Sequence, residues 1–80
     1  MQPSFDIVVP VRNEESSVAE FYARLDQLGY ADRLIFVDNA STDRTRAIID
    51  GFPKGRTIVH EIDEGYGASV RDGIVASRAA

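Results

Sequence analysis

Short apolar runs and amphipathic stretches alternate three times along the 80-residue chain. The apolar runs are rich in β-branched residues and predict strands over Phe5–Val11, Arg33–Val37 and Thr57–Ile62. The first run is apolar at successive positions, which is typical of a parallel strand that is buried on both faces. The pattern therefore predicts a sheet whose strands run in the same direction.

Apolar residues at helical spacing follow each predicted strand. We expect three helices: one from about Glu14 to Leu28, one that begins near Ser41 or Thr42 and stops before Gly51, and one from about Gly67 to Arg78. The apolar stripe of the first consists of Val18, Phe21, Tyr22, Leu25 and Leu28. Ser17 and Glu20 have the spacing of a capping box at its start, and Gly29 fits the position that ends it.

Strands that alternate with helices form parallel sheets through right-handed crossovers. The predicted fold class is therefore α/β, a layered parallel sheet of three βα units in the strand order 3-2-1. A chain of this length holds one small domain, so residues 1–80 are treated as one unit. Three strands leave two open sheet edges, and a homodimer is one expected way of covering an edge.

Composition removes several classes of function. The absence of cysteine excludes disulfide bonds and thiolate metal sites. A net charge of -4 without a basic face argues against nucleic acid as a partner. The longest apolar run, Ile7–Val11, is too short to cross a bilayer, and the N-terminus lacks the layout of a signal peptide. We expect the chain to be cytoplasmic, or to lie on the cytosolic face of a membrane.

A polar segment follows each predicted strand: Pro10–Glu15, Asp38–Asp43 and Asp63–Gly67. In open parallel sheets, ligands bind beyond the carboxyl ends of the strands. Because these ends share one edge of the sheet, we expect the three segments to meet there and form a ligand site.

The candidate side chains each have a structural alternative. Asp38 could bond a base or a ribose hydroxyl, or it could accept bonds from loop amides and shape the turn. Asp43 and Ser41 have the spacing of a helix cap, which favours a structural role. Glu14 stands where a helix dipole stabilises carboxylates, and it could also reach a ligand.

The third segment carries weaker signals. Gly65 and Gly67 allow close approach of a ligand to the backbone, and Arg71 could pair with a phosphate or lie on a solvated helix face. The glycines follow the third strand rather than the first, so a nicotinamide-binding domain is disfavoured. His60 has no partner at ligand spacing in the sequence and is expected to be a structural or surface residue.

Taken in order, three motifs resemble those of the family 2 glycosyltransferases. They are Ile7-Val8-Val9-Pro10-Val11-Arg12-Asn13-Glu14-Glu15, Val37-Asp38-Asn39-Ala40-Ser41-Thr42-Asp43-Arg44-Thr45 and Glu64-Gly65-Tyr66-Gly67-Ala68-Ser69-Val70-Arg71-Asp72-Gly73. The third is most similar to the dolichyl-phosphate mannose synthase-like branch. The resemblance covers nearly the whole chain.

The resemblance implies the N-terminal, nucleotide-binding half of a GT-A (Rossmann-like) fold, with a nucleotide-diphosphate sugar as donor. It implies inverting transfer to an acceptor, for which a polyprenyl phosphate or a saccharide is a candidate. The nucleotide-binding residues that it implies are Pro10, Arg12, Glu14, Asp38, Gly67 and Arg71.

Two departures from the family pattern bear on catalysis. Asn39 stands where the second motif usually has its second aspartate, and the chain ends at Ala80 before an Asp-x-Asp motif. The resemblance implies that this motif holds a divalent metal, Mg²⁺ or Mn²⁺, so no metal ligand is assigned here, and no catalytic base either. We expect the 80 residues alone to bind the donor nucleotide without transferase activity.

Two other interpretations stay open. The chain could be a non-catalytic nucleotide-binding or interaction module that uses the same segments. A flavodoxin-like or receiver-like α/β domain is a third interpretation, which Pro10–Glu15 fits poorly, because such domains need an acidic cluster or a phosphate loop after the first strand.

Overall fold

The computed structural model describes residues 5–63 and 65–76. Strands and helices alternate along the described chain: β1 (Ile7–Val11), α1 (Val18–Gln27), β2 (Leu34–Asn39), α2 (Thr45–Asp50), β3 (Arg56–His60) and α3 (Tyr66–Ala76), with a short 3₁₀ turn at Ala31–Arg33. The predicted α/β class, with a three-stranded parallel sheet, is confirmed. None of the helices in the described part has the length and apolarity that crossing a membrane requires.

The middle strand of the sheet is β2, and all six of its residues are buried. It pairs in parallel with β1, where Val11 lies opposite Asp38, and with β3, where His60 lies opposite Asn39. The order across the sheet is β1-β2-β3, which reads 3-2-1 from the other edge. Among the described residues, β1 and β3 each have one edge without a neighbouring strand.

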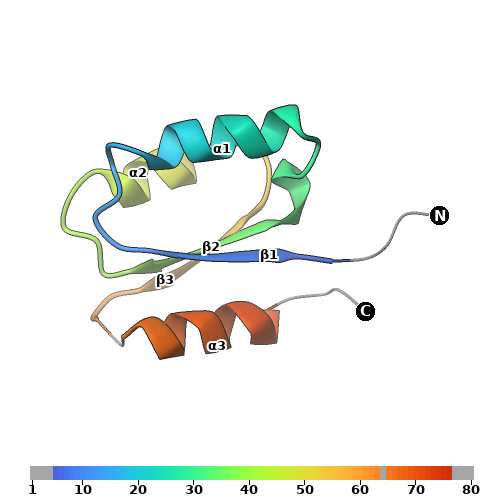
Figure 1. Ribbon diagram of the computed structural model, residues 1–80. Coiled ribbons are helices and arrows are strands. Elements are labelled where there is room, and N and C mark those ends of the chain that lie inside the picture. Colours follow the sequence, from blue (N-terminus) through green and yellow to red (C-terminus); the bar gives the residue numbers. More distant parts are fainter. Residues whose placement is uncertain (1–4, 64, 77–80) are drawn as a thin grey trace.

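The helices form a layer on each face of the sheet. Helices α1 and α2 cover one face, and α3 covers the other (Figure 1). Since side chains alternate along a strand, Leu34 and Phe36 face α1 and α2, whereas Ile35 and Val37 face α3. The main core lies on the α1 and α2 side and consists of Val11, Val18, Tyr22, Ala31, Leu34, Phe36 and Ile49.

Helix α1 begins four residues later than the sequence predicts, at Val18 instead of Glu14. Asn13 has a φ of 54°, outside the helical region. The backbone amides of Asn13 and Glu14 donate to the side chains of Ser41 and Thr45, so they are satisfied without a helix. The predicted capping box is wrong, because Ser17 makes no capping bond with its side chain. The predicted end is confirmed: Gly29 adopts a φ of 83°, which glycine tolerates best, directly after the helix.

The other boundaries differ for related reasons. Strand β2 runs on to Asn39, because Asp38 still pairs with both neighbouring strands and Asn39 still pairs with β3. Helix α2 begins only at Thr45, whose amide donates to Asp43. Strand β3 ends at His60, and Ile62 lies exposed beyond it. The predicted end of the third helix, Arg78, falls outside the described residues.

Gly73 lets α3 lie close to β1. A Cβ atom at this position would overlap Cγ1 of Val8 and would lie 3.2 Å from its Cβ and Cγ2. Valine is stiff at χ1 and cannot turn away easily. A Cβ on Gly67, in the first turn of the same helix, would meet nothing within 4 Å.

We therefore expect Gly73→Ala to lower the free energy of unfolding by about 1–2 kcal/mol, since overpacking outweighs the better helix propensity of alanine. The matched variant Gly67→Ala should leave stability equal or raise it by up to about 1 kcal/mol. Urea denaturation of both variants checks the pair. Equal effects of the two substitutions would contradict the close approach of α3 to Val8.

Tyr22 carries a buried hydroxyl that has no hydrogen-bond partner in the described structure. Its ring stacks on Phe52 with centroids 3.9 Å apart. An unpaired buried hydroxyl costs about 1–3 kcal/mol of desolvation. We expect Tyr22→Phe to raise the free energy of unfolding by about 1 kcal/mol, while Tyr30→Phe at an exposed position changes it little. Thermal denaturation of the two variants measures this, and a less stable Tyr22→Phe would show that the hydroxyl is satisfied.

Candidate functional site

A crevice of about 410 Å³ opens at the carboxyl ends of the strands. Its walls come from the β1–α1 segment, the end of β2 and the β3–α3 segment, and the lining residues are Pro10, Val11, Arg12, Glu14, Asn39, Asp63, Gly65 and Ser69. The structure thus brings together all three polar segments that follow the strands. This is the edge at which open parallel sheets bind ligands.

The carboxylate of Asp63 joins the three walls of the crevice. Its Oδ1 accepts bonds from Nδ2 of Asn39 at 2.7 Å and from the amide of Gly65 at 2.8 Å. Its Oδ2 accepts a bond from Nη1 of Arg12, also at 2.7 Å. The bond from the Gly65 amide, followed by that from Asn39 and the charge of Arg12, holds the pKa of Asp63 below its ordinary value.

A second network ties the β1–α1 loop to the β2–α2 loop. The amide of Thr42 donates to Oδ1 of Asn13 at 2.8 Å, and the amide of Asn13 donates to Oγ of Ser41 at 3.0 Å. The amide of Glu14 donates to Oγ1 of Thr45 at 2.7 Å. These bonds take up the backbone donors of a loop that has no helix or strand to satisfy them.

Asp43 belongs to the same network, and the structural role expected for it is confirmed. Its Oδ1 accepts a bond from the amide of Thr45 at 2.9 Å and its Oδ2 one from the amide of Glu15 at 3.2 Å. Partial desolvation raises the pKa of Asp43, but the bonds from the side chain and amide of Thr45 and from Glu15 outweigh it, so that the pKa lies below 3.8.

Asp38 does not line the crevice. It is 1% exposed, and it lies on the same face of β2 as Phe36, toward α1 and α2. The hydroxyl of Ser41 donates to its Oδ1, which is the turn-shaping contact that the sequence left as an alternative. Asn39, the next residue, faces the α3 side and lines the crevice.

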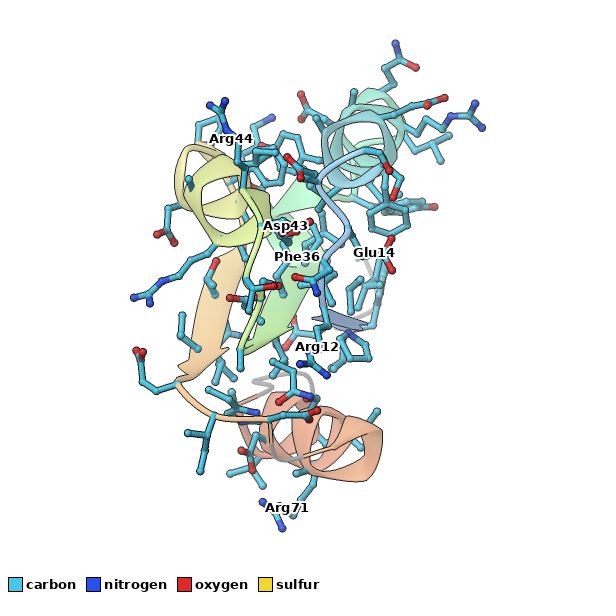
Figure 2. All side chains as sticks on the ribbon, turned by 90° about the vertical axis from the view of Figure 1, so that its left-hand side faces the viewer. Arg12, Glu14, Phe36, Asp43, Arg44 and Arg71 are labelled. Atoms are coloured by element: carbon cyan, nitrogen blue, oxygen red, sulfur yellow. The ribbon has the colours of Figure 1, made fainter. Side chains whose placement is uncertain are left out.

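The remaining residues implied by the family resemblance fall into two groups. Pro10, Arg12 and Glu14 line the crevice. Figure 2 shows Arg12 beside the end of β1, between the sheet and α3, and Arg71 on the far side of α3, pointing away from the sheet. Nε of Arg71 donates to Oδ1 of Asp72 at 3.1 Å, and Gly67 is exposed, with nothing within 4 Å of where its Cβ would be.

Sequence reasoning did not single out Asn39 and Asp63 as lining residues. The signal for Asn39 was the alternation along β2, which becomes informative once Phe36 is known to face the main core. Asp63 lies in a segment that was expected at the site, but its contact with Arg12 joins positions 51 residues apart. No local pattern encodes that contact.

His60 is buried and bonded to other side chains, which agrees with the structural role that was one of the two expected for it. Its Nε2 lies 2.7 Å from Oδ2 of Asp72, and its Nδ1 lies 3.4 Å from Oδ1 of Asn39. The bond to His60, followed by that from Arg71, lowers the pKa of Asp72. The pair fastens α3 to β3 behind the crevice, which is the structural role proposed as one alternative.

No group of three or more His, Cys, Asp or Glu side chains within 5–63 and 65–76 is placed to hold a metal ion. Of the residues that the structure describes in the crevice lining, two carry carboxylates, Glu14 and Asp63, and Asp63 is already bonded to Arg12. The described residues therefore do not fit a resident divalent metal, and no chemical step is assigned to one here.

The lowered pKa of Asp43 predicts acid sensitivity. Near pH 3.8 the folded state binds fewer protons than the unfolded state, so this stabilisation is complete above 3.8 and is lost as the pH falls through the lowered pKa. We expect the gap in unfolding free energy between wild type and Asp43→Asn to close as the pH falls from about 6 to about 2. Urea denaturation across this range tests it, and a gap that does not change with pH would contradict it.

The comparisons with known proteins agree with this arrangement at the level of the family. The sequence model described as "Glycosyl transferase family 2" matches residues 6–79, and hence all three segments that line the crevice. The comparison with curated proteins and the comparison with solved structures each found no match. With a match over almost its entire length and the strand-end segments gathered at one edge, the chain belongs to glycosyl transferase family 2.

Proposed function

We propose that the crevice binds the nucleoside part of a nucleotide-diphosphate sugar and so supplies donor recognition to a glycosyltransferase. Membership of the family supports glycosyl transfer as the general activity. The observation that carries the proposal is the meeting of Arg12, Asn39 and Asp63 at the carboxyl edge of the sheet, around a space of about 410 Å³. A space of this size lies within the range typical of small-molecule sites.

The chemistry of the lining suits a nucleoside. Pro10 and Val11 offer an apolar wall for a base or a ribose ring. The carboxamide of Asn39 carries both a donor and an acceptor, which is what the edge of a base or a pair of ribose hydroxyls requires. Within the proposal, Asn39 takes the recognition role that the family resemblance implied for Asp38, because Asn39 faces the space and Asp38 is buried on the opposite side.

The proposed reaction is an inverting displacement at the anomeric carbon of the donor sugar. An acceptor oxygen forms the new bond to carbon while the bond to the nucleoside diphosphate breaks, and where the acceptor is a saccharide, a carboxylate takes the proton of its hydroxyl. No residue of this chain is assigned as that base. A divalent metal, Mg²⁺ or Mn²⁺, remains part of the proposal, with ligands other than the described residues.

Further features belong to the same proposal. Two helices on one face and one on the other, over three parallel strands, support the nucleotide-binding half of a GT-A, Rossmann-like fold. The third motif supports the dolichyl-phosphate mannose synthase-like branch, and with it a lipid-phosphate acceptor reached from the cytosolic face of a membrane; a saccharide is the other candidate acceptor. The open edges of β1 and β3 support pairing with a second copy of the chain.

Titration of the chain with uridine, guanosine and adenosine diphosphates, followed by amide NMR shifts, tests the donor site. We expect one of them to shift the amides of Val11, Asn39 and Gly65, because these residues line the crevice. Asn39→Ala should weaken that binding about three- to tenfold, as the loss of one or two hydrogen bonds predicts.

Arg71→Ala should change the affinity less than about twofold, since this side chain points away from the sheet. The variant Arg24→Ala, which removes an exposed pair with Glu20 on α1, controls for general effects of losing an arginine. Shifts confined to residues outside the crevice, or an Arg71→Ala effect larger than that of Asn39→Ala, would refute the proposed site.

A further inference from the structure

The contacts of Asp63 have the form of an occupied anion site. A guanidinium nitrogen of Arg12, the amide nitrogen of the Asn39 side chain and the backbone N–H of Gly65 all donate to this one carboxylate, at 2.7, 2.7 and 2.8 Å. Donors of these kinds also bind phosphate oxygens in proteins. The lowered pKa of Asp63 shows that its surroundings favour a negative charge at this point.

Whether an anion can use the positive charge of the lining depends on what Arg12 contacts. Among the described residues that line the crevice, Arg12 is the one basic residue, and Glu14 and Asp63 are the two acidic ones. While Arg12 is paired with Asp63, an incoming anion would meet a lining with an excess of negative charge. An anionic ligand gains a favourable partner only when the guanidinium becomes available to it.

The two oxygens of the Asp63 carboxylate have different kinds of partner. Its Oδ1 contacts Asn39, which is 7% exposed, and a backbone amide. Its Oδ2 contacts Arg12 in a pair whose side chains are 48% and 44% exposed. Solvent screens exposed ion pairs, which contribute little to stability, so Arg12 can exchange partners while the Oδ1 bonds persist.

We propose that Asp63 is a built-in competitor at the donor site, whose Oδ2 occupies the Arg12 guanidinium until a phosphate oxygen of the ligand takes its place. The inference rests on the proposed function for the identity of the ligand, a nucleoside diphosphate. It assigns Arg12 to the anionic part of that ligand. Asp63 then has two effects: it joins the three walls of the crevice when no ligand is bound, and it weakens the binding of anions because it competes for Arg12.

Asp63→Asn is the informative substitution. The carbonyl oxygen of the new amide can keep the bonds from Asn39 and Gly65, while its NH₂ group faces Arg12 and releases it. We expect inorganic pyrophosphate, measured by calorimetry at low salt, to bind this variant about three- to tenfold more tightly than wild type. This gain in affinity for pyrophosphate should disappear in the double variant Arg12→Ala with Asp63→Asn. In Asp63→Asn alone, the gain should shrink at high salt.

Asp26→Asn is the matched control. It removes an ion pair of nearly the same length and exposure, 2.8 Å and 47%/42% between Lys54 and Asp26, far from the crevice. This variant should bind pyrophosphate as wild type does. Should Asp63→Asn fail to fold, the carboxyl ¹³C shift of Asp63 in wild type gives a second measure: pyrophosphate should move it and leave the Asp26 signal in place.

The outcomes separate this inference from the donor-site proposal. Equal or weaker binding of pyrophosphate to Asp63→Asn, or an Asp63 carboxyl signal that pyrophosphate does not move, overturns the competitor role even if nucleosides bind. A tighter pyrophosphate complex of Asp63→Asn supports the competitor role even if uncharged uridine, guanosine and adenosine all fail to bind, a result that would remove the nucleoside from the proposed function.

Discussion

The β1–α1 loop, the end of β2 and the β3–α3 loop meet at a single carboxylate, that of Asp63. The sheet brings these segments to its carboxyl edge but does not by itself determine how they lie relative to one another. The bonds from Arg12, Asn39 and Gly65 supply that relation. Because Arg12 and Asn39 lie far from Asp63 in the sequence, these bonds hold the β1–α1 loop and the end of β2 against the β3–α3 loop.

The second network, between Asn13 and the β2–α2 loop, explains why the first loop is ordered without a helix. Its amides donate to Ser41, Thr45 and Asp43, so the backbone donors are satisfied by side chains of a neighbouring loop. The polar side chains of Ser41, Asp43 and Thr45 therefore act as structural hydrogen-bond acceptors. The lining of the crevice comes mainly from β1, Asn39 and the β3–α3 segment.

The two candidate recognition residues on β2 lie on opposite faces of the sheet. Asp38 and Asn39 are neighbours in sequence, yet the pleat sends them to opposite faces, one toward α1 and α2 and the other toward α3 and the crevice. His60 and Asp72 then support the α3 face from behind, through a 2.7 Å contact next to Asn39. The crevice is thus built on the central strand and one helix, and the pair of Arg12 and Asp63 is more exposed than Asn39.

The sequence alone determined the α/β class, the number of βα units and the parallel sheet, because hydrophobic periodicity and β-branched runs are local properties that burial follows directly. It also determined that polar segments follow each strand, and through three motifs it indicated the family. Helix starts at Glu14 and Ser41 were misjudged, because capping signals are local while the amides there bond to a distant loop.

Only the tertiary structure decided which polar side chains face the crevice. The choice between Asp38 and Asn39 depends on which face of β2 meets which helices, and periodicity cannot supply this for a strand that is apolar on both faces. The outward direction of Arg71 follows from how α3 lies on the sheet, with Gly73 against Val8. Asp63 also contacts Arg12 and Asn39, which are 51 and 24 residues away in the sequence, and contacts between such distant positions exist only once the chain has folded.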